Sequence, residues 1–528
     1  MKSSSFRRIP LSVSSIPEKR KTGTMFIVTI FCFFVFSTLA LGLVFLSQIH
    51  LRLNGLRKDS VLMDYASENG IKTGFHDLMK ALNSATSPRV ISKENYERLK
   101  ESTACAQLRL VEEAVGRSFP VVILETGEGL TWKSQTNCFW DSFAEAENFF
   151  LAQFRLEIDS EGWLKSLPPR RNSRLQTRAG ILAGHVPLSF FPLLIDKNLD
   201  SEERHDFEKE NEIEITLPPQ NLSPAQASFA QEALIPQEAD ALIEKALNIK
   251  IFRPQDLSTA KLRLVLGLEE SDAPVPDGVY LLQNDLGLGG IYVQGDVKEM
   301  VTAIEEDFQV ISFRMEEDSW ILKFSPSRSK TLFYSPSGLL SFNLLPLGII
   351  IVNGKVESLG GGMVDAAGEV RLVRDEEIPS LLSGINLTLV ASEKITITSH
   401  LIRRGVTWQE GIPYLKEKDA QLVIFSTGKD LWQDEARDGG IAIEADAPAG
   451  IQIHASLAAQ GEGFRIEGKN RDIRLVGSLQ TTEYIAQGNR LQIFPQHPSD
   501  FMNAAVLMPE TEKPVIFLSF FEILAWKE

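Results

Sequence analysis

The sequence predicts an α+β protein with a long transmembrane and amphipathic helix at its N-terminus, a mixed α/β middle and an all-β C-terminal region. Three observations lead to this prediction. Residues 24–46 are an uncharged apolar run, residues 81–270 alternate helix-type and strand-type segments, and residues beyond 275 form short β-type runs. We therefore expect a basic leader (1–23), the helix (24–80), a mixed α/β domain (81–270) and a β-rich domain (275–528).

The composition argues against several classes of protein. The 528 residues carry 54 basic and 70 acidic side chains, a net charge of −16, whereas a general nucleic-acid binder needs a basic surface. Three cysteines are too few for a disulfide-stapled scaffold or a structural zinc array. We expect a large, acidic, folded protein without a nucleic-acid partner.

The N-terminal segment predicts a membrane anchor. Six basic residues and one glutamate precede residue 24, and a helix over residues 24–46 would reach ~35 Å, enough to cross a ~30 Å hydrocarbon core. The positive-inside rule keeps the basic leader in the cytoplasm and places most of the chain outside. A cleaved secretory signal is the alternative, but its apolar region is normally about 7–15 residues long.

The helix is expected to continue beyond the membrane. Apolar or small residues recur at helical spacing as far as Gly70, and no proline interrupts residues 24–87. Charged residues fall mostly on the other side of the helical wheel. The pattern predicts one continuous helix, half in lipid and half in water.

The start of this helix resembles a prepilin-type (class III) signal. Residues 21–28 read Lys-Thr-Gly-Thr-Met-Phe-Ile-Val, in which a basic leader ends in glycine before an apolar helix. The resemblance implies that a prepilin peptidase cuts between Gly23 and Thr24. Major pilins carry a glutamate five residues after the cut, where this chain has Val28, so the resemblance is to a minor component.

The rest of the helix resembles the N-terminal family of PilX-type pilus-assembly proteins. The matching positions are Asn54-Gly55 and the segment Ala66-Ser67-Glu68-Asn69-Gly70, in which Glu68 and Gly70 match the family's A-E-A-G element and Asn69 departs from it. The resemblance implies a single-pass protein of the bacterial cytoplasmic membrane. It also implies that other pilin-like subunits bind through the N-terminal helix.

The middle region is predicted to contain both helices and strands. Residues 94–113 and 236–247 have helical composition and spacing, whereas residues 120–125 and 212–217 are strand-like. Cys105 and Cys138 would both face an oxidising compartment, so they form one disulfide or remain two buried thiols.

The C-terminal region is a succession of short strands and turns. The segments at residues 290–296 and 348–355 share one pattern: a glycine, an apolar strand, and a turn made of a polar residue followed by glycine. Such strands build a sandwich, a barrel or a parallel β-helix; we favour the β-helix and keep the sandwich as the alternative. Residues 275–493 also resemble an uncharacterised extracytoplasmic domain found behind PilX-type N-termini, which supports architecture more than mechanism.

No motif in the sequence predicts catalysis. The seven histidines show no metal-binding spacing, so we expect neither a metal nor another cofactor, and His454 is expected to be a solvated strand residue. The glycines at 287–290 precede a strand rather than a helix, which favours a turn over a phosphate loop. Acidic runs at 305–307, 316–318 and 375–377 are typical of solvated turns. We therefore do not expect an enzyme.

Three functions are compatible with these patterns. The first is a pilin-like structural or assembly component of a type IV pilus or related secretion filament, with a large exported β-rich head. The second is a membrane-anchored β-helix protein that binds or cleaves extracellular polysaccharide. The third is an uncleaved, anchored binding protein unrelated to pili.

Overall fold

A computed structural model describes most of the chain. The described residues are 22–85, 89–100, 121–125, 130–145, 148–164, 167–188, 191, 193–195, 212–216, 228–229, 240–247, 257–284, 287–415, 421–432, 435–486, 488–495, 510–511 and 513–527. They form one long N-terminal helix and a remainder dominated by strands, which confirms the predicted α+β class.

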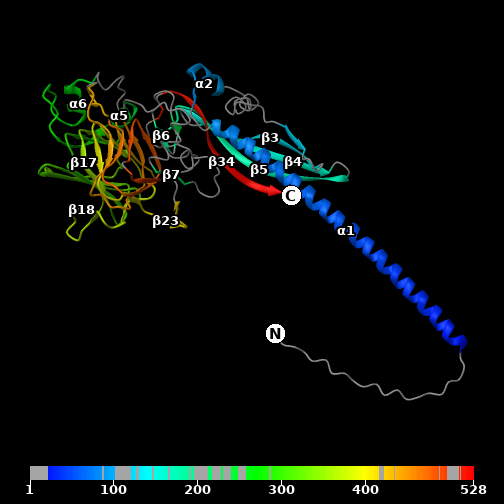
Figure 1. Cartoon of the computed structure of the whole chain (residues 1–528). Coiled ribbons are helices and arrows are strands. Elements are labelled where there is room, and N and C mark those ends of the chain that lie inside the picture. Colours follow the sequence, from blue (N-terminus) through cyan, green and yellow to red (C-terminus); the bar gives the residue numbers. More distant parts are fainter. Residues whose placement is uncertain are drawn as a thin grey trace, which may run out of the picture.

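The helix α1 (Thr22–Ala85) is continuous over 64 residues. Its N-terminal part projects away from the rest of the molecule, whereas its C-terminal part lies on a sheet (Figure 1). The uninterrupted helix follows from the absence of proline and from helical apolar spacing, as the sequence predicted.

The sheet beneath α1 is antiparallel and uses both ends of the chain. The C-terminal strand β34 lies between β1 and β5, so residues that follow the whole β-rich region complete this sheet (Figure 1). The short helix α2 (Lys93–Lys100) follows β1. In spatial order the strands are β1 (Arg89–Val90), β34 (Val515–Lys527), β5 (Leu167–Gly184), β4 (Phe149–Leu164), β3 (Leu130–Glu145) and β2 (Val121–Glu125).

A nine-stranded sheet runs through the β-rich region. From β10 to β8 every pairing is parallel, and its two faces pack on different apolar clusters. The strands in spatial order are β8 (Ser228–Phe229), β6 (Leu193–Ile195), β31 (Ser478–Thr481), β28 (Ser456–Ala459), β25 (Gln421–Ser426), β20 (Asn386–Ala391), β16 (Ile349–Asn353), β10 (Gly287–Gln294) and β9 (Gly278–Asn284).

An eleven-stranded sheet faces it across the main core. One half is parallel, and the other half is an antiparallel ribbon that ends at β15. Its strands in spatial order are β15 (Gly338–Phe342), β14 (Lys330–Ser335), β13 (Asp318–Ser325), β12 (Phe308–Met315), β11 (Glu299–Glu305), β17 (Val356–Val364), β21 (Ile395–Ile397), β26 (Ile441–Ile443), β29 (Phe464–Ile466) and β32 (Tyr484–Ile485), with β18 (Val370–Leu372) beside β17.

Smaller pairings complete the β-rich region. A third, four-stranded parallel sheet contains β27 (Gln452–Ile453), β30 (Asp472–Val476), β33 (Arg490–Phe494) and β7 (Ile213–Ile215). Two pairs stand outside these sheets: β19 (Pro379–Leu381) with β22 (Ile402–Arg403), and β23 (Val406–Gln409) with β24 (Ile412–Leu415).

The chain visits these sheets in a repeating order. After β25 it passes through β26 and β27, returns to the nine-stranded sheet at β28, and repeats the circuit through β29 and β30 to β31. We call the three sheets that these circuits build the parallel stack. The two repeated segments, 290–296 and 348–355, are neighbours in it, because Ile291–Gln294 pair in register with Ile350–Asn353. Strands of the nine-stranded sheet are buried on both faces, which explains continuous apolar runs such as that of β16.

Two helices cover the outer face of the nine-stranded sheet. Residues of α5 (Asp240–Leu247) and α6 (Thr259–Val265) pack against Tyr292, Ile351 and Phe425. A Cβ at Gly290 would lie 2.9 Å from Ala246 Cβ, so glycine here permits the close approach of α5. The glycines at 287–290 therefore belong to a strand under a helix rather than to the expected turn.

The described strands cross the expected domain boundary near residue 270. β6, β7 and β8 precede that boundary in sequence, yet they extend the parallel sheets at the end where the last strands β31 and β33 lie. β34 joins the sheet that holds α1. Both connections between the two parts of the molecule therefore emerge at one end of the stack.

Candidate functional site

The N-terminal half of α1 is apolar and exposed. Phe31, Phe33 and Phe36 are each about 70% exposed, and α1 is the helix in the described chain that is long and apolar enough to cross a membrane. One polar side chain in this half is satisfied within the helix, since Thr38 Oγ1 donates to the Phe34 carbonyl oxygen at 2.7 Å. This half has the properties of a membrane span.

The C-terminal half of α1 docks on the antiparallel sheet through small residues. Ala66, Ser67 and Gly70 are buried, and Ser67 Oγ lies 2.8 Å from Ser173 Oγ on β5. A Cβ at Gly70 would overlap Ser160 Oγ, and a Cβ at Gly74 would overlap Ser134 Oγ. The helix approaches the strands this closely because glycine carries no side chain.

The sheet contributes a matching set of small and polar residues. A Cβ at Gly162 would lie 2.6 Å from the backbone nitrogen of Ser67, so this β4 glycine is also required by the close approach. Among the described residues, Ser134 Oγ, Ser160 Oγ and Trp132 Nε1 are buried without a hydrogen-bond partner. The contact between α1 and β3, β4 and β5, which we call the helix–sheet seam, is therefore close-packed but poor in satisfied polar groups.

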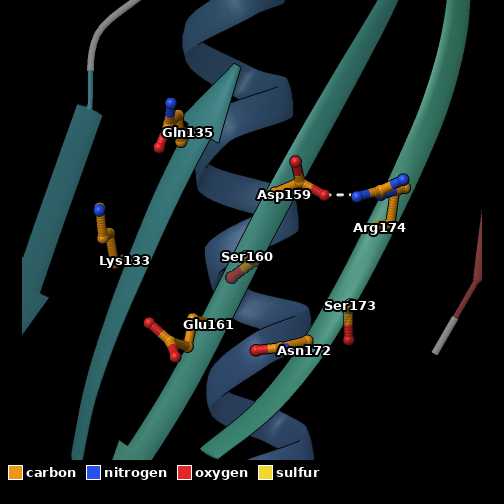
Figure 2. A pocket seen from close by; sticks show the side chains of 8 residues that line it. All are labelled: Lys133, Gln135, Asp159, Ser160, Glu161, Asn172, Ser173 and Arg174. Carbon is orange, nitrogen blue, oxygen red and sulfur yellow. Dashed lines mark hydrogen bonds and ion pairs between the residues drawn. The ribbon is translucent and has the colours of Figure 1, made fainter. Parts of the chain in front are cut away.

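The opposite face of the same sheet carries charged and amide side chains around a hollow of about 450 Å³ (Figure 2). Arg174 Nε donates to Asp159 Oδ1 at 2.7 Å, and Asn137 Nδ2 donates to Asp159 Oδ2 at 3.0 Å. The hydrogen bond to Asp159 and its charge raise the pKa of Arg174 above the ordinary value. The side chains on this face are those of Lys133, Gln135, Asp159, Glu161, Asn172 and Arg174, and they alternate along the strands with Ser160 and Ser173, whose side chains point to α1.

This charged face largely neutralises itself. Arg174 Nη1 also lies 3.4 Å from Glu157 Oε2, and Gln176 Nε2 donates to Glu157 Oε1 at 2.7 Å. Arg178 pairs with Asp141 at 3.0 Å. Opposite charges alternate across neighbouring strands, which stabilises the long hairpins and leaves no large field of one sign among these described residues.

The structure places the predicted processing and family residues along α1. Gly23 and Thr24 lie in its first turn, and Asn54 and Gly55 are exposed in the part that projects from the sheet. A Cβ at Gly55 would meet nothing within 4 Å. Gly70, in contrast, is buried in the helix–sheet seam, and Glu68 is half-buried beside it.

The predicted disulfide falls partly outside the described residues. Cys105 lies outside them, and of Cys138 the structure describes only its backbone pairing with Leu156. Cys32 is an exposed free thiol in the apolar half of α1. The bridge stays a prediction.

The expectation for His454 was wrong in its exposure. The residue does face away from Ile451 and Ile453, but it is only 5% exposed, and its Nδ1 accepts a hydrogen bond from the Arg403 backbone nitrogen at 3.1 Å. Burial, followed by the charge of Arg403, lowers its pKa to about 3. The nearby His400 is also buried, and its Nδ1 accepts from the Gln452 backbone nitrogen.

The acidic run at 305–307 lies at a hairpin turn with basic and hydroxyl partners. Lys323 Nζ lies 2.7 Å from Glu305 Oε2, and Arg328 Nη2 lies 2.8 Å from Asp307 Oδ1. Hydrogen bonds led by that from Ser327 lower the pKa of Asp307. Among the described residues no group of three or more His, Cys, Asp or Glu side chains could hold a metal ion.

No family model, curated protein or solved structure matches this chain. The inference about function therefore depends on the molecule's own geometry. Sequence reasoning missed the helix–sheet seam, although the alternation of Leu156 and Ile158 with Glu157 and Asp159 is a strand signal. That alternation would have identified β4, one of the strands on which α1 lies.

Proposed function

We propose that the protein is a pilin-like, membrane-anchored structural or assembly component of a type IV pilus or related filament, with a large exported β-rich head. One observation carries the proposal: a single helix is exposed and apolar over its first half and packed on an antiparallel sheet over its second. A helix of this kind connects a bilayer rigidly to an exported head. The resemblance of residues 21–70 to prepilin-type signals and to the PilX-type family gives further support.

The proposed action is physical rather than catalytic. The apolar half of α1 resides in the bacterial cytoplasmic membrane, with the basic leader in the cytoplasm. A prepilin peptidase removes the leader after Gly23. The freed helix then packs laterally against the apolar helices of other pilin-like subunits, and the head remains outside.

We infer that the head is a parallel β-helix. Its support is the repeating circuit through three sheets and the in-register parallel pairing of strands such as β20, β25 and β28. Each circuit buries one side against the next, so the head is an elongated stack. The alternative of a polysaccharide-cleaving β-helix gains little support from the acidic run at 305–307, because its carboxylates are paired with Lys323 and Arg328.

The test is the N-terminus of the mature protein. The full chain is expressed with and without a prepilin peptidase, recovered from membranes, and examined by intact mass and N-terminal sequencing. We expect a chain beginning at Thr24 only when the peptidase is present, and a full-length chain for Gly23→Leu. Gly55→Leu is the matched control, because a side chain there meets nothing within 4 Å.

Retention of residues 1–23 in both cells would exclude pilin-type processing and favour an uncleaved anchored protein. If the leader is removed, cross-linking from the exposed face of α1 to other pilin-like subunits is the next expected result. Failure of that cross-linking would contradict the filament role while leaving the anchor intact.

A further inference from the structure

The antiparallel ribbon of the head ends in an open, apolar edge. β15 is the last strand of the eleven-stranded sheet and, in the described chain, pairs only with β14. Leu339 and Leu340 are 54% and 52% exposed, and they point to opposite faces of the strand. Unpaired edge strands of this kind are normally protected by charges, prolines or bulges.

The apolar character extends beyond the strand. Leu344, Leu345 and Leu347 follow β15 and are 50%, 38% and 37% exposed. Residues 331–354 contain no charged side chain, in a chain of which 23% is charged. We call Leu339, Leu340, Leu344, Leu345 and Leu347, together with the free edge of β15, the leucine edge. An exposed apolar cluster on an open strand indicates an interaction surface.

The position of the leucine edge argues against the membrane as its partner. The green strands of the ribbon lie at the end of the molecule opposite the N-terminal part of α1 (Figure 1). A bilayer that holds the apolar half of α1 is therefore far from β15. This position favours a protein surface beside the distal head as the partner.

We propose that β15 pairs antiparallel with β15 of a second copy of this chain. A two-fold axis through Leu340 places Leu340 of one copy opposite Leu340 of the other. At each end of the paired strands, Gly338 of one copy then lies opposite Phe342 of the other. The absent side chain of Gly338 leaves room for the Phe342 ring, a cross-strand combination known to rescue edge glycines. Each copy thus satisfies the other's open edge through an isologous contact.

The distribution of charge permits a contact between two copies at this edge. Two copies of a protein with a net charge of −16 repel one another over most of their surfaces. The uncharged segment 331–354 is where two copies can approach without like charges meeting. The dimer contact does not depend on leader cleavage, so it can be tested separately from the proposed function.

A charge-swap experiment tests the dimer. The full-length chain in detergent micelles is measured by sedimentation and native mass spectrometry as wild type, Leu340→Lys, Leu340→Glu and an equimolar mixture of the two variants. We expect a wild-type dimer, dissociation constants raised about tenfold or more for each variant alone, and heterodimers in the mixture. Restoration in the mixture shows that both variants are folded.

Leu264→Lys is the matched control, since Leu264 is 50% exposed on α6 and lies outside the leucine edge. A second measurement places Leu340→Cys in a chain with Cys32, Cys105 and Cys138 changed to Ser. Paired residues on a two-fold axis have Cα atoms about 4.5–5.5 Å apart, so a disulfide between the introduced thiols of the two copies should form on mild oxidation.

Three results would overturn the proposal: a wild-type chain that is monomeric at every concentration tested, a dimer unaffected by Leu340→Lys, or a mixture that fails to form heterodimers. Association through α1 would persist in all Leu340 variants and would therefore be recognised as a different contact. Binding of the leucine edge to lipid vesicles instead of to a second copy would likewise contradict it.

Discussion

The helix–sheet seam and the parallel stack are held together in opposite ways. The stack surrounds a continuous core of buried Ile, Leu, Val and Phe side chains contributed by both large sheets. In the seam, the contacts instead join glycines and serines, and three buried polar atoms have no partner among the described residues. The stack is expected to be stable through apolar burial, whereas the seam depends on close fit and can be released at lower cost.

The largest expected effect comes from a cavity in the stack. Phe464 is fully buried in β29 and stacks on Tyr484 with ring centroids 5.9 Å apart. Phe464→Ala should lower the free energy of unfolding by about 3–5 kcal/mol. Chemical denaturation followed by circular dichroism measures the loss, with Tyr414→Ala as the control because Tyr414 is 58% exposed. Equal losses in the two variants would contradict the assignment of stability to the stack's core.

Acid should weaken the stack before it weakens the seam. Burial lowers the pKa values of His400 and His454, that of His454 to about 3, so the folded protein disfavours protonation of both imidazoles. The unfolded chain binds their protons near pH 6.5. Stability is therefore complete above that pH and falls toward pH 3, by ~1.4 kcal/mol per unit for His454 alone.

The acid effect can be measured as a difference between two chains. His454→Gln cannot titrate, so its free energy of unfolding should decline less steeply than that of the wild type between about pH 6.5 and 4.5. This window lies above the range in which most carboxylates become protonated. Parallel pH profiles would show that His454 is not a buried neutral group.

Crowding the seam should detach α1 while leaving the head folded. Gly70→Ala places a Cβ in contact with Ser160 Oγ and should cost about 1–3 kcal/mol of docking free energy. Hydrogen exchange at residues 63–74 should increase, whereas exchange in the stack should not change. Gly55→Ala is the matched control on the same helix.

A second variant tests whether the effect is steric. Ser160→Ala removes the Oγ atom and leaves the Ser160 Cβ position at 3.1 Å from the added methyl group, so Gly70→Ala with Ser160→Ala should recover part of the loss. Additive losses in the double variant would contradict the close-contact account of the seam.

The same contrast separates what could be predicted from the sequence from what could not. The helix α1 was predictable because its apolar run and its lack of proline are local properties. The apolar runs of the stack were also visible, since strands buried on both faces are continuous in sequence. The seam was not predicted, because it depends on a contact between Gly70 and Ser160, which lie far apart in the sequence. Neither residue carries a local pattern that indicates this contact.

Long-range topology accounts for the other omissions. The sequence places β34 at the opposite end of the chain from β1, and no local pattern indicates that the two strands pair. His454 could be placed on the outward face of its strand from the alternation with Ile451 and Ile453. Its burial depends on residues near 400 that reach it only in the folded stack.

The smallest expected loss of stability comes from a substitution on the charged face of the antiparallel sheet, the face that points away from α1. Arg174→Ala removes the 2.7 Å pair with Asp159, but both side chains are more than one-third exposed, and such pairs are screened by water and salt. The melting temperature should fall by no more than about 2 °C at low salt, and the difference should disappear at about 1 M salt. Differential scanning calorimetry at the two salt concentrations measures it.

A large, salt-independent loss for Arg174→Ala would mean that the outer face, rather than the seam, holds the long strands β4 and β5 in place. Gly70→Ala and Arg174→Ala act on opposite faces of one sheet. Comparing the stability lost in each variant therefore shows which face supports α1. We expect the seam variant to dominate, because steric overlap in a buried contact cannot be relieved by solvent, whereas a lost surface ion pair is replaced by hydration.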